Sequence, residues 1–216
     1  MTERTIDAVV LDIGGVLLDW SPDYLYADLI PDEEQRVHFL TNVTTREWNH
    51  KQDEGRPWAE AIAELKGLHP EHAEWIEAYD KGWLKMVKGV FEDTAAALTQ
   101  IQALGIPTYA LTNFSAEKWE VAKEAFPVLS TFDGEVVSGV EQTVKPDEKI
   151  FRILLDRFGL DPARTFYTDD VQYNVDGART VGLDAELFTG AAGLREQLRS
   201  RGIAIQATKA EPAREH

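Results

Sequence analysis

One short stretch constrains the fold more than any other, residues 9–17 with the sequence Val-Val-Leu-Asp-Ile-Gly-Gly-Val-Leu. The β-branched and bulky residues at 9–11 predict a buried strand, which places Asp12 at its carboxyl end. In an open parallel sheet, ligands bind at that end of the strands. Gly14 and Gly15 carry no Cβ atom, so backbone amides beside Asp12 can approach an anion. On its own, the stretch is equally compatible with an ordinary turn.

From residue 91 onward, apolar strands alternate with helices. Strands are predicted over 106–111, 132–138, 165–168 and 183–188, with a helix after each. Ser115 is the expected N-cap of the first of these helices. Repeated strand-helix units of this length indicate a parallel sheet covered by helices on both faces. The predicted fold class is therefore α/β, a doubly wound parallel sheet of the Rossmann type.

Residues 19–88 are rich in Glu, Ala, Trp and Leu and show no strand-like alternation. Pro22 and the segment 31–34 have the composition of helix starts. We expect a helical cap over 18–88, inserted into a core of 1–17 and 89–206, and a polar, disordered tail over 207–216. Five of the six tryptophans lie in the cap. Most are expected to fill its core, but Trp20, nearest to Asp12, is a candidate substrate contact.

Composition excludes several classes of function. The formal net charge of −16 argues against binding nucleic acid or an anionic membrane. The absence of cysteine excludes disulfides, thiolate catalysis and zinc-thiolate sites. Residues 1–5 are short and polar, and no apolar run approaches membrane-spanning length, so a soluble cytoplasmic protein is expected. No feature of the sequence distinguishes a monomer from a dimer.

Polar residues follow the predicted strands or precede a helix at four places along the chain. Because the carboxyl ends of parallel strands meet at one edge of a sheet, these side chains are expected to converge. Each could instead be a turn or a helix cap, but their occurrence together favours a functional site. Thr112 offers a hydroxyl donor, and the amide of Asn113 lies near a helix N-terminus, where phosphate binds favourably. The set comprises Asp12, Thr112, Asn113, Lys145, Asp169 and Asp170.

These residue types suit phosphoryl transfer. A carboxylate can attack phosphorus and carry it as an aspartyl-phosphate, and Asp12 is the candidate nucleophile. Lys145 can neutralise charge on Asp12 and on the transferring group. Asp169 and Asp170, facing Asp12, would form an oxygen cage suited to Mg²⁺.

These motifs resemble, in the same order, the four motifs of the haloacid dehalogenase-like hydrolase superfamily. The resemblance covers nearly the whole chain, and the helical block resembles the small cap of that superfamily. The first motif and the segment Gln52–Gly55 look most like a bacterial branch of sugar-phosphate phosphatases. The matching segments are Asp12–Leu17, Leu111–Asn113, Val144–Pro146, and Asp169-Asp170 with Asn174 and Gly177-Ala178.

The resemblance implies a Mg²⁺-dependent phosphatase that acts on a small phosphorylated metabolite through an intermediate on Asp12. The carbonyl of Gly14 would bind the metal together with Asp12 and Asp170, and Asp169 would bind it directly or through water. The implied phosphate-binding residues are Gly14, Gly15, Thr112, Asn113 and Lys145.

One position departs from the pattern of these phosphatases, which usually carry a second aspartate where this chain has Gly14. That aspartate protonates the leaving oxygen and later takes a proton from the attacking water, which glycine cannot do. One account is that the substrate has a leaving group that needs no proton, and another is that the protein binds phosphorylated ligands without efficient turnover. A third account gives the role to another side chain, and the candidates are His50, Asp53 and Glu54 in the cap and Asp19 nearby in the chain.

Two other functions compete with a phosphatase. One is a metal-independent 2-haloacid dehalogenase, in which Asp12 attacks carbon. The pair Asp169-Asp170 argues against it, because two uncompensated carboxylates would repel a haloacid, and the sequence shows no arginine near the first motif. The other is a non-catalytic binding protein, suggested by Gly14. Arg56 is a further candidate for binding the polar end of a substrate.

Overall fold

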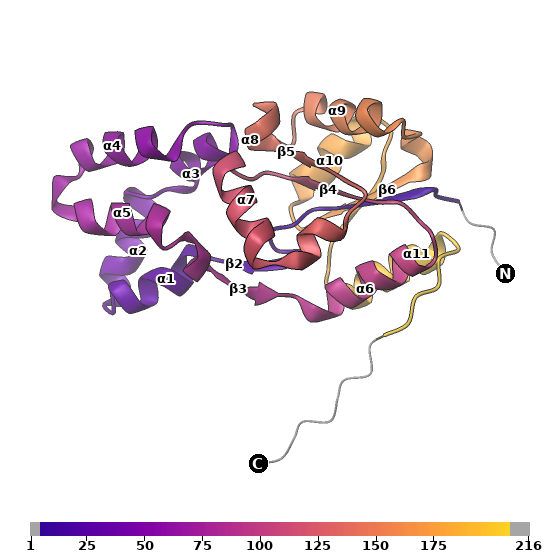
Figure 1. Ribbon diagram of the computed structural model, residues 1–216, viewed down its shortest axis with the longest axis horizontal. Helices are drawn as coiled ribbons and strands as arrows, with labels where there is room; N and C mark the ends of the chain where they lie inside the picture. The colour runs from indigo at the N-terminus through magenta and orange to yellow at the C-terminus, as the bar shows by residue number, and fades with distance from the viewer. Residues whose placement is uncertain (1–4, 208–216) are drawn as a thin grey trace, which may run out of the picture.

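The computed structural model describes residues 5–207 and shows a five-stranded sheet in the order β5-β4-β1-β6-β7, in which every neighbouring pair is parallel. Helices cover both faces of the sheet (Figure 1). The predicted α/β fold class is confirmed. The strands are β1 Ala8–Leu11, β4 Thr108–Thr112, β5 Gly134–Val137, β6 Thr165–Asp169 and β7 Asp184–Leu187.

The central strand, β1, pairs with β4 on one side and β6 on the other, so the chain reverses its direction of travel across the sheet at β1. All four residues of β1 are buried. Val9 and Leu11 face one hydrophobic cluster and Val10 faces the other, as the alternation of side chains along a strand requires. The carboxyl end of a strand at such a reversal point is where open α/β sheets bind ligands.

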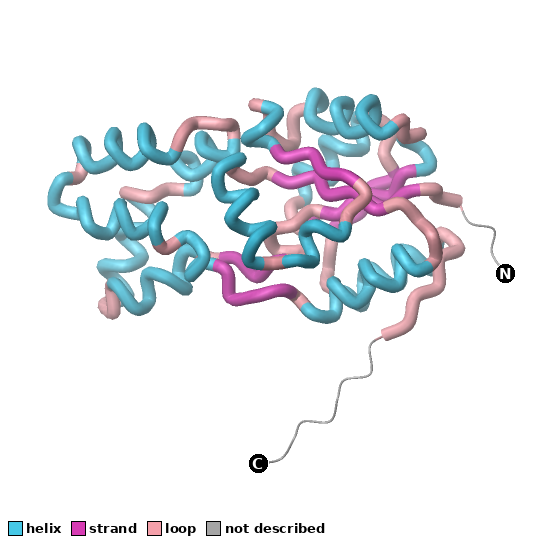
Figure 2. The backbone as a smooth tube through the Cα atoms, in the orientation of Figure 1, coloured by secondary structure: helices cyan, strands magenta, loops and turns pink. Residues whose placement is uncertain are grey.

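The core helices pack as two layers. α9 (Glu148–Phe158) contacts β5, α10 (Gln172–Thr180) contacts β6 and β7, and the two helices also touch each other. On the opposite face, α6 (Glu92–Ala103) packs against α11 (Ala191–Ser200). Figure 2 shows these helices above and below the sheet. The remaining core helical segments are α7 Ala116–Ala125, α8 Ser138–Glu141 and the short 3-10 turns η3 Pro127–Thr131 and η4 Pro162–Arg164.

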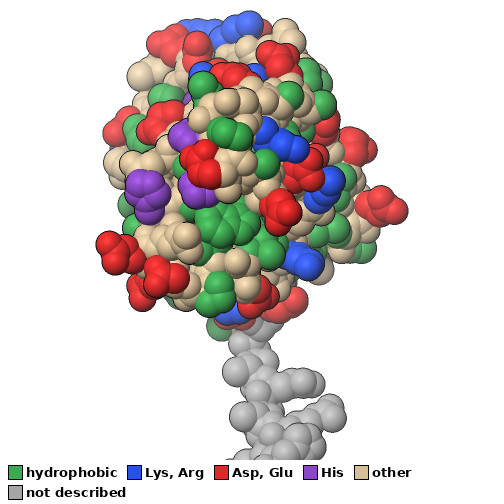
Figure 3. All heavy atoms as spheres, turned by 90° about the vertical axis from the view of Figure 1, so that its left-hand side faces the viewer, with side chains coloured by type: hydrophobic (Ala, Val, Ile, Leu, Met, Phe, Trp, Pro, Cys, Tyr) green, Lys and Arg blue, Asp and Glu red, His purple; other side chains and the backbone are tan. Residues whose placement is uncertain are grey.

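The inserted block is helical and forms a separate group beside the carboxyl edge of the sheet (Figure 1). Helices begin at Pro22 and directly after Asp32, whose side chain accepts a hydrogen bond from the backbone of Gln35, as expected. Acidic side chains are spread over the outer end of this block (Figure 3). Its elements are α1 Pro22–Leu29, α2 Glu33–Asn42, α3 Arg46–Asp53, α4 Trp58–Leu68, η1 Pro70–His72, α5 Ala73–Lys81 and η2 Trp83–Met86.

The cap tryptophans lie partly inside the cap and partly at its boundary with the core, where the ring of Trp83 contacts that of Phe114. Trp48, Trp58 and Trp83 are buried, and the rings of Trp48 and Trp58 both contact the ring of Tyr79. Trp20 is only partly buried and faces the core domain.

The two segments that join cap to core are strands, where the sequence analysis expected none. β2 (Leu18–Trp20) and β3 (Val87–Val90) pair antiparallel as a two-stranded ribbon. The expectation was wrong because each strand is too short to show a pattern, and each satisfies its backbone only by pairing with a segment about seventy residues away. Both predicted domain boundaries, 17/18 and 88/89, fall at this ribbon.

The disordered tail predicted for 207–216 lies outside the described residues, except for Ala207. Across residues 5–207, none of the helices combines the length and the apolar character needed to cross a bilayer.

Candidate active site

The edge formed by the strand ends brings together two of the predicted carboxylates around the predicted cation, Lys145. The Nζ atom of Lys145 lies 2.8 Å from Asp12 Oδ1 and 2.7 Å from Asp169 Oδ2. It also donates to the carbonyl oxygen of Leu111 at 3.0 Å. Lys145 is 1% exposed, Asp12 7% and Asp169 0%. These side chains therefore form a buried, directly bonded cluster.

Burial and charge act against each other in this cluster. Burial alone would lower the pKa of Lys145, but Asp12 and Asp169 outweigh it and raise that pKa, so the ammonium stays charged. For Asp169, burial is outweighed by Lys145 and by hydrogen bonds, so its pKa is lowered. Burial raises the pKa of Asp12 to about 7 against the effect of Lys145. The neighbours of Asp12 thus offset the effect of burial less completely than those of Asp169. A further cation beside Asp12 would stabilise its charged form.

Asp169 is already fully hydrogen-bonded. Its Oδ1 accepts from the backbone of Val171 at 2.8 Å, and both oxygens accept from Asn174 Nδ2 at 3.1 Å. The hydroxyl of Tyr167 and the Nζ of Lys145 donate to its Oδ2. A carboxylate offers about four lone-pair positions, so a cation in this site would contact Asp169 through water rather than directly.

The three carboxylates form a cluster that fits a divalent cation. Oxygen atoms of Asp12, Asp169 and Asp170 lie within 4.8 Å of one another. A Cβ atom on Gly15 would lie 2.2 Å from Asp170 Oδ2, so glycine at this position makes room for that carboxylate. Carboxylate oxygens are the ligands that Mg²⁺ prefers. The donor set therefore fits Mg²⁺, with the carbonyl of Gly14 as a further expected ligand on the same loop.

Thr112 and Asn113, the predicted phosphate-binding residues at the end of β4, are held in place by the core. The side-chain amide of Asn113 donates to the carbonyl of Lys145 at 3.0 Å and accepts from its backbone amide at 2.8 Å. This pairing fixes the loop that carries Lys145. Thr112 is 1% exposed at the end of β4. Asn113 lines the cavity that lies between this cluster and the cap, whereas Thr112 does not.

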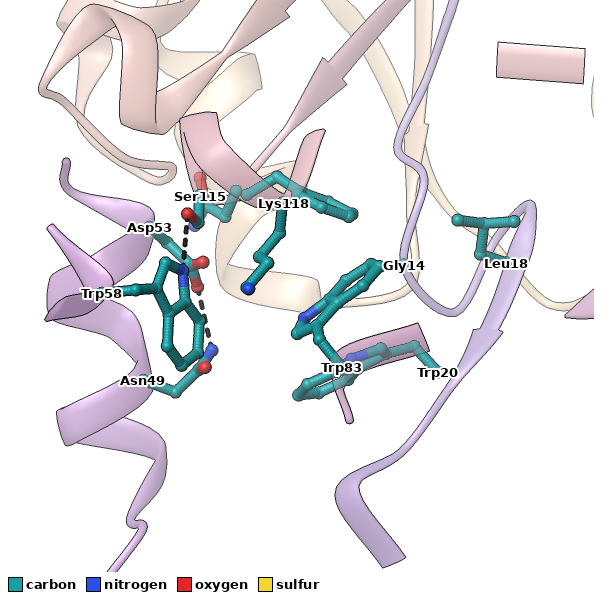
Figure 4. A pocket seen from close by; sticks show the side chains of 11 residues that line it. Gly14, Leu18, Trp20, Asn49, Asp53, Trp58, Trp83, Ser115 and Lys118 are labelled. Carbon is teal, nitrogen blue, oxygen red and sulfur yellow. Dashed lines mark hydrogen bonds between the residues drawn. The ribbon is translucent and has the colours of Figure 1, made fainter. Parts of the chain in front are cut away.

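A cavity of about 510 Å³ separates this cluster from the cap. A smaller cavity of about 80 Å³ adjoins it, with walls that include Trp20, Trp58, Trp83 and Phe114 (Figure 4). The larger cavity is lined from the core by Asp12, Gly14, Gly15, Asn113, Lys145 and Asp170, and from the cap by Trp20, Arg46, Asn49, His50, Asp53 and Tyr79, among others.

The four residues predicted to replace the missing acid/base aspartate differ in whether they line these cavities. Asp19 accepts a hydrogen bond from the hydroxyl of Tyr24 at 2.7 Å, and Glu54 is exposed; neither lines a cavity. His50 lines the larger cavity, but its side chain is 45% exposed and lies 3.9 Å from the carboxylate of Glu54. Asp53 is partly buried and lines both cavities.

Asp53 belongs to a cap segment that is docked onto the core. Its carbonyl oxygen accepts from Ser138 Oγ at 2.5 Å, and its carboxylate accepts from the backbone amide of Ser115 and from Asn49 Nδ2. Ser115 occupies the expected N-cap position of α7, but its side chain does not cap that helix. Its hydroxyl accepts from Trp58 Nε1 at 2.8 Å instead (Figure 4). The cap is therefore tied to the core next to Asp53.

Sequence reasoning missed Arg46 and Asn49, which line the larger cavity. Together with His50 and Asp53 they follow the spacing i, i+3, i+4, i+7 along α3, a helical face that could have identified them. The charge of Arg46 opposes the rise that burial causes in the pKa of Asp170. Arg56, the predicted substrate contact, instead bonds Gln52 and Glu64, at 2.7 Å each.

Comparisons with known proteins agree with this arrangement. The chain is 24% identical to the sesquiterpene phosphatase astK of Aspergillus oryzae over 183 residues, which cover 83% of this chain and 88% of that protein. Its fold is similar to that of a haloacid dehalogenase family enzyme from Bacteroides thetaiotaomicron solved as a magnesium complex. The TM-score is 0.68 at 19% identity, with 86% of this chain and 94% of that chain covered.

A dehalogenase structure is similar as well, with a TM-score of 0.69 at 16% identity over 91% of this chain and 98% of that chain. At these identities the solved structures show the fold alone. The family model for haloacid dehalogenase-like hydrolases matches residues 6–182. Given this match and the order in which the strand ends supply the site residues, the chain belongs to the haloacid dehalogenase-like hydrolase family.

Proposed function

We propose that this hydrolase is a Mg²⁺-dependent phosphatase that transfers the phosphoryl group of a small phosphorylated metabolite to Asp12 and then to water. The observation that carries the proposal is the position of Asp12. Its carboxylate lies 2.8 Å from the buried Lys145 ammonium and belongs to a three-carboxylate cluster at the floor of a cavity. That combination supplies a nucleophile, a fixed positive charge and a cation site within one pocket.

Each residue of the cluster has a distinct part in the reaction. Asp12 attacks phosphorus, and Lys145 offsets the charge on Asp12 and on the transferring oxygens. Asp169 holds Lys145 in place through the 2.7 Å contact. Mg²⁺, held by Asp12, Asp170 and the Gly14 carbonyl, would supply the charge neutralisation that lets an anionic ester approach an anionic nucleophile.

The smaller cavity favours a substrate whose organic group is apolar or flat next to the phosphate. Its aromatic walls lie beside Gly14, whose position leaves open space next to Asp12. The similarity to a sesquiterpene phosphatase supports an organic phosphate of this kind. Phosphate attraction must be local, because the formal net charge of the chain is −16.

A specific observation also favours haloacid dehalogenation as a second candidate. The sequence shows no arginine near the first motif, but Arg46 lines the cavity and could hold a carboxylate. Against this candidate, Asp170 projects into the same cavity and would repel a haloacid unless a cation is bound beside it.

The deciding experiment measures phosphate release from p-nitrophenyl phosphate and acetyl phosphate, with Mg²⁺ and with chelator, beside chloride release from 2-chloropropionate. Mg²⁺-dependent phosphate release that falls by about 10⁴-fold or more in Asp12→Asn supports the proposal. Asp28→Asn, an exposed carboxylate on α1, is the matched control. Chloride release in the presence of chelator would favour the dehalogenase, and silence in both assays would favour a binding protein.

A further inference from the structure

The two cavities meet at a small set of shared residues. Gly14, Trp20, Asn49, Asp53 and Asn113 line both of them. The phosphoryl group must sit in the larger cavity with Asp12, and the aromatic cavity offers room for the organic group. The oxygen that joins phosphorus to that group then lies at this junction. Within the shared set, Asp53 has the only side chain that can give and take a proton near neutral pH.

The core side of the junction cannot supply that proton. A Cβ atom built on Gly14 meets no atom within 4 Å, so this wall of the junction is open space. The side chain of Asn113 is engaged with the backbone of Lys145. The proton must therefore come from the cap side, where Asp53 is located.

Asp53 is held in this position from two directions. Ser138 Oγ donates to its carbonyl oxygen, and the Ser115 backbone amide donates to its carboxylate. Gly55, with φ of 104°, follows in a turn where a Cβ atom would lie 3.0 Å from the carbonyl oxygen of Gly139. These contacts fix the end of α3 against the core, so the carboxyl group has a defined location next to the reacting group. Figure 4 shows Asp53 between Ser115 and Asn49.

The surroundings of Asp53 also keep it protonated for part of the time at neutral pH. Its pKa is raised to about 7, chiefly by burial and also by the charges of Glu54 and Asp12, while the Ser115 amide and Lys145 oppose the rise. Asp12, Lys145 and Asp53 line the same cavity. His50, by contrast, lines only the larger cavity, and its side chain is 45% exposed.

We infer that Asp53, on the cap, is the proton donor to the leaving alcohol and then the base for the attacking water, an inference that rests on the proposed phosphatase function. In the first step, Asp12 bonds to phosphorus, the ester P–O bond breaks, and the Asp53 carboxyl gives its proton to the departing oxygen, releasing the alcohol. In the second step, the Asp53 carboxylate takes a proton from water as that water attacks the phosphorus on Asp12. The bond between phosphorus and the Asp12 oxygen breaks, phosphate leaves, Asp12 is again a carboxylate and Asp53 is again protonated.

The test compares first-turnover rates for n-butyl phosphate, whose alcohol needs a proton, and p-nitrophenyl phosphate, whose phenolate does not. With Mg²⁺ present, Asp53→Asn should slow the first release of butanol by about 10²- to 10⁴-fold. The first release of p-nitrophenol should stay close to the wild-type rate and appear as a burst, because hydrolysis of the intermediate then becomes slow. Asp28→Asn, at an exposed carboxylate on α1 that lines neither cavity, should match the wild type on both esters.

Equal first-turnover losses on both esters would assign Asp53 a structural role and overturn the inference while leaving the phosphatase intact. An unchanged rate on n-butyl phosphate would overturn it too. A wild-type protein that releases phosphate from neither ester would overturn the proposed function itself, and the role of Asp53 with it.

Discussion

The core side and the cap side of the cavity differ in how firmly their polar groups are held. On the core side, the Lys145 ammonium has three partners within 3.0 Å, and Asp169 accepts from four different residues. On the cap side, Arg46 is exposed and His50 meets Glu54 only at 3.9 Å. Asp53 is the exception, because its segment is bonded to Ser115 and Ser138.

This difference separates two tasks. Holding phosphate beside a nucleophile demands fixed charges, and the buried core cluster provides them without reorganisation during the reaction. Choosing the organic group requires only a wall of suitable shape, which the cap can vary through exposed side chains. The docked end of α3 connects the two tasks, since Asp53 must be placed as accurately as a core residue although it belongs to the cap.

Removing the central cation should produce the largest effect on the core side. In Lys145→Met, two buried carboxylates lose their shared partner, which should lower the free energy of unfolding by about 3–5 kcal/mol. The same change should reduce kcat/KM for p-nitrophenyl phosphate by about 10²- to 10³-fold. Chemical denaturation and steady-state kinetics measure the two losses.

Lys149→Met is the matched control for this change, because Lys149 is exposed on α9, four residues along the chain. It should alter stability by no more than about 0.5 kcal/mol. If Lys145→Met were as stable as this control, the core cluster would not be held more firmly than the cap side.

A second experiment asks whether placing Asp53 between cap and core costs stability. Its pKa of about 7 in the folded protein exceeds the ordinary value of 3.8. Between these two pH values Asp53 therefore binds more protons in the folded state than in the unfolded state. The free energy of unfolding consequently falls as the pH rises through this range. Asp53→Asn should gain stability relative to the wild type by about 1–4 kcal/mol between about pH 4 and pH 8.

Denaturation curves of both proteins at several pH values measure that gain as a difference. The Asp12 and Lys145 side chains are present in both proteins, so their contribution to the pH dependence cancels to first order. A difference that stays constant with pH would mean that Asp53 is as freely solvated as the other acidic groups of the cap.

The same contrast explains how much could be predicted from sequence. Asp12, Lys145, Asp169 and Asp170 could be identified because each stands at or beside the end of a core element, and parallel strands bring such ends together. The ribbon of β2 and β3 could not be predicted, since its hydrogen bonds join segments far apart in the chain.

The cap residues were harder to rank for a related reason. His50 and Asp53 lie on one face of the same helix, and nothing local distinguishes them. The distinction comes from Ser138, which lies 85 residues further along the chain and fixes the end of α3. Arg56 was predicted as a substrate contact, because its bonds to Gln52 and Glu64 leave no mark in the sequence. Local pattern thus predicts where strand ends meet, but it does not predict which helix residue a distant contact selects.

The smallest predicted effect is on Mg²⁺ affinity. A comparison of two glycine-to-alanine variants distinguishes backbone strain from crowding at the cation site. Gly15 and Gly105 have φ of 71° and 70°, so alanine at either should cost about 1–2 kcal/mol of stability. Only at Gly15 would the new Cβ atom meet Asp170, at 2.2 Å, whereas at Gly105 it meets nothing within 4 Å. Gly15→Ala alone should therefore raise the Mg²⁺ concentration for half-maximal activity, by about tenfold for each 1.4 kcal/mol of lost binding. An equal rise in Gly105→Ala would attribute the effect to general strain and remove the evidence that Asp170 holds the metal.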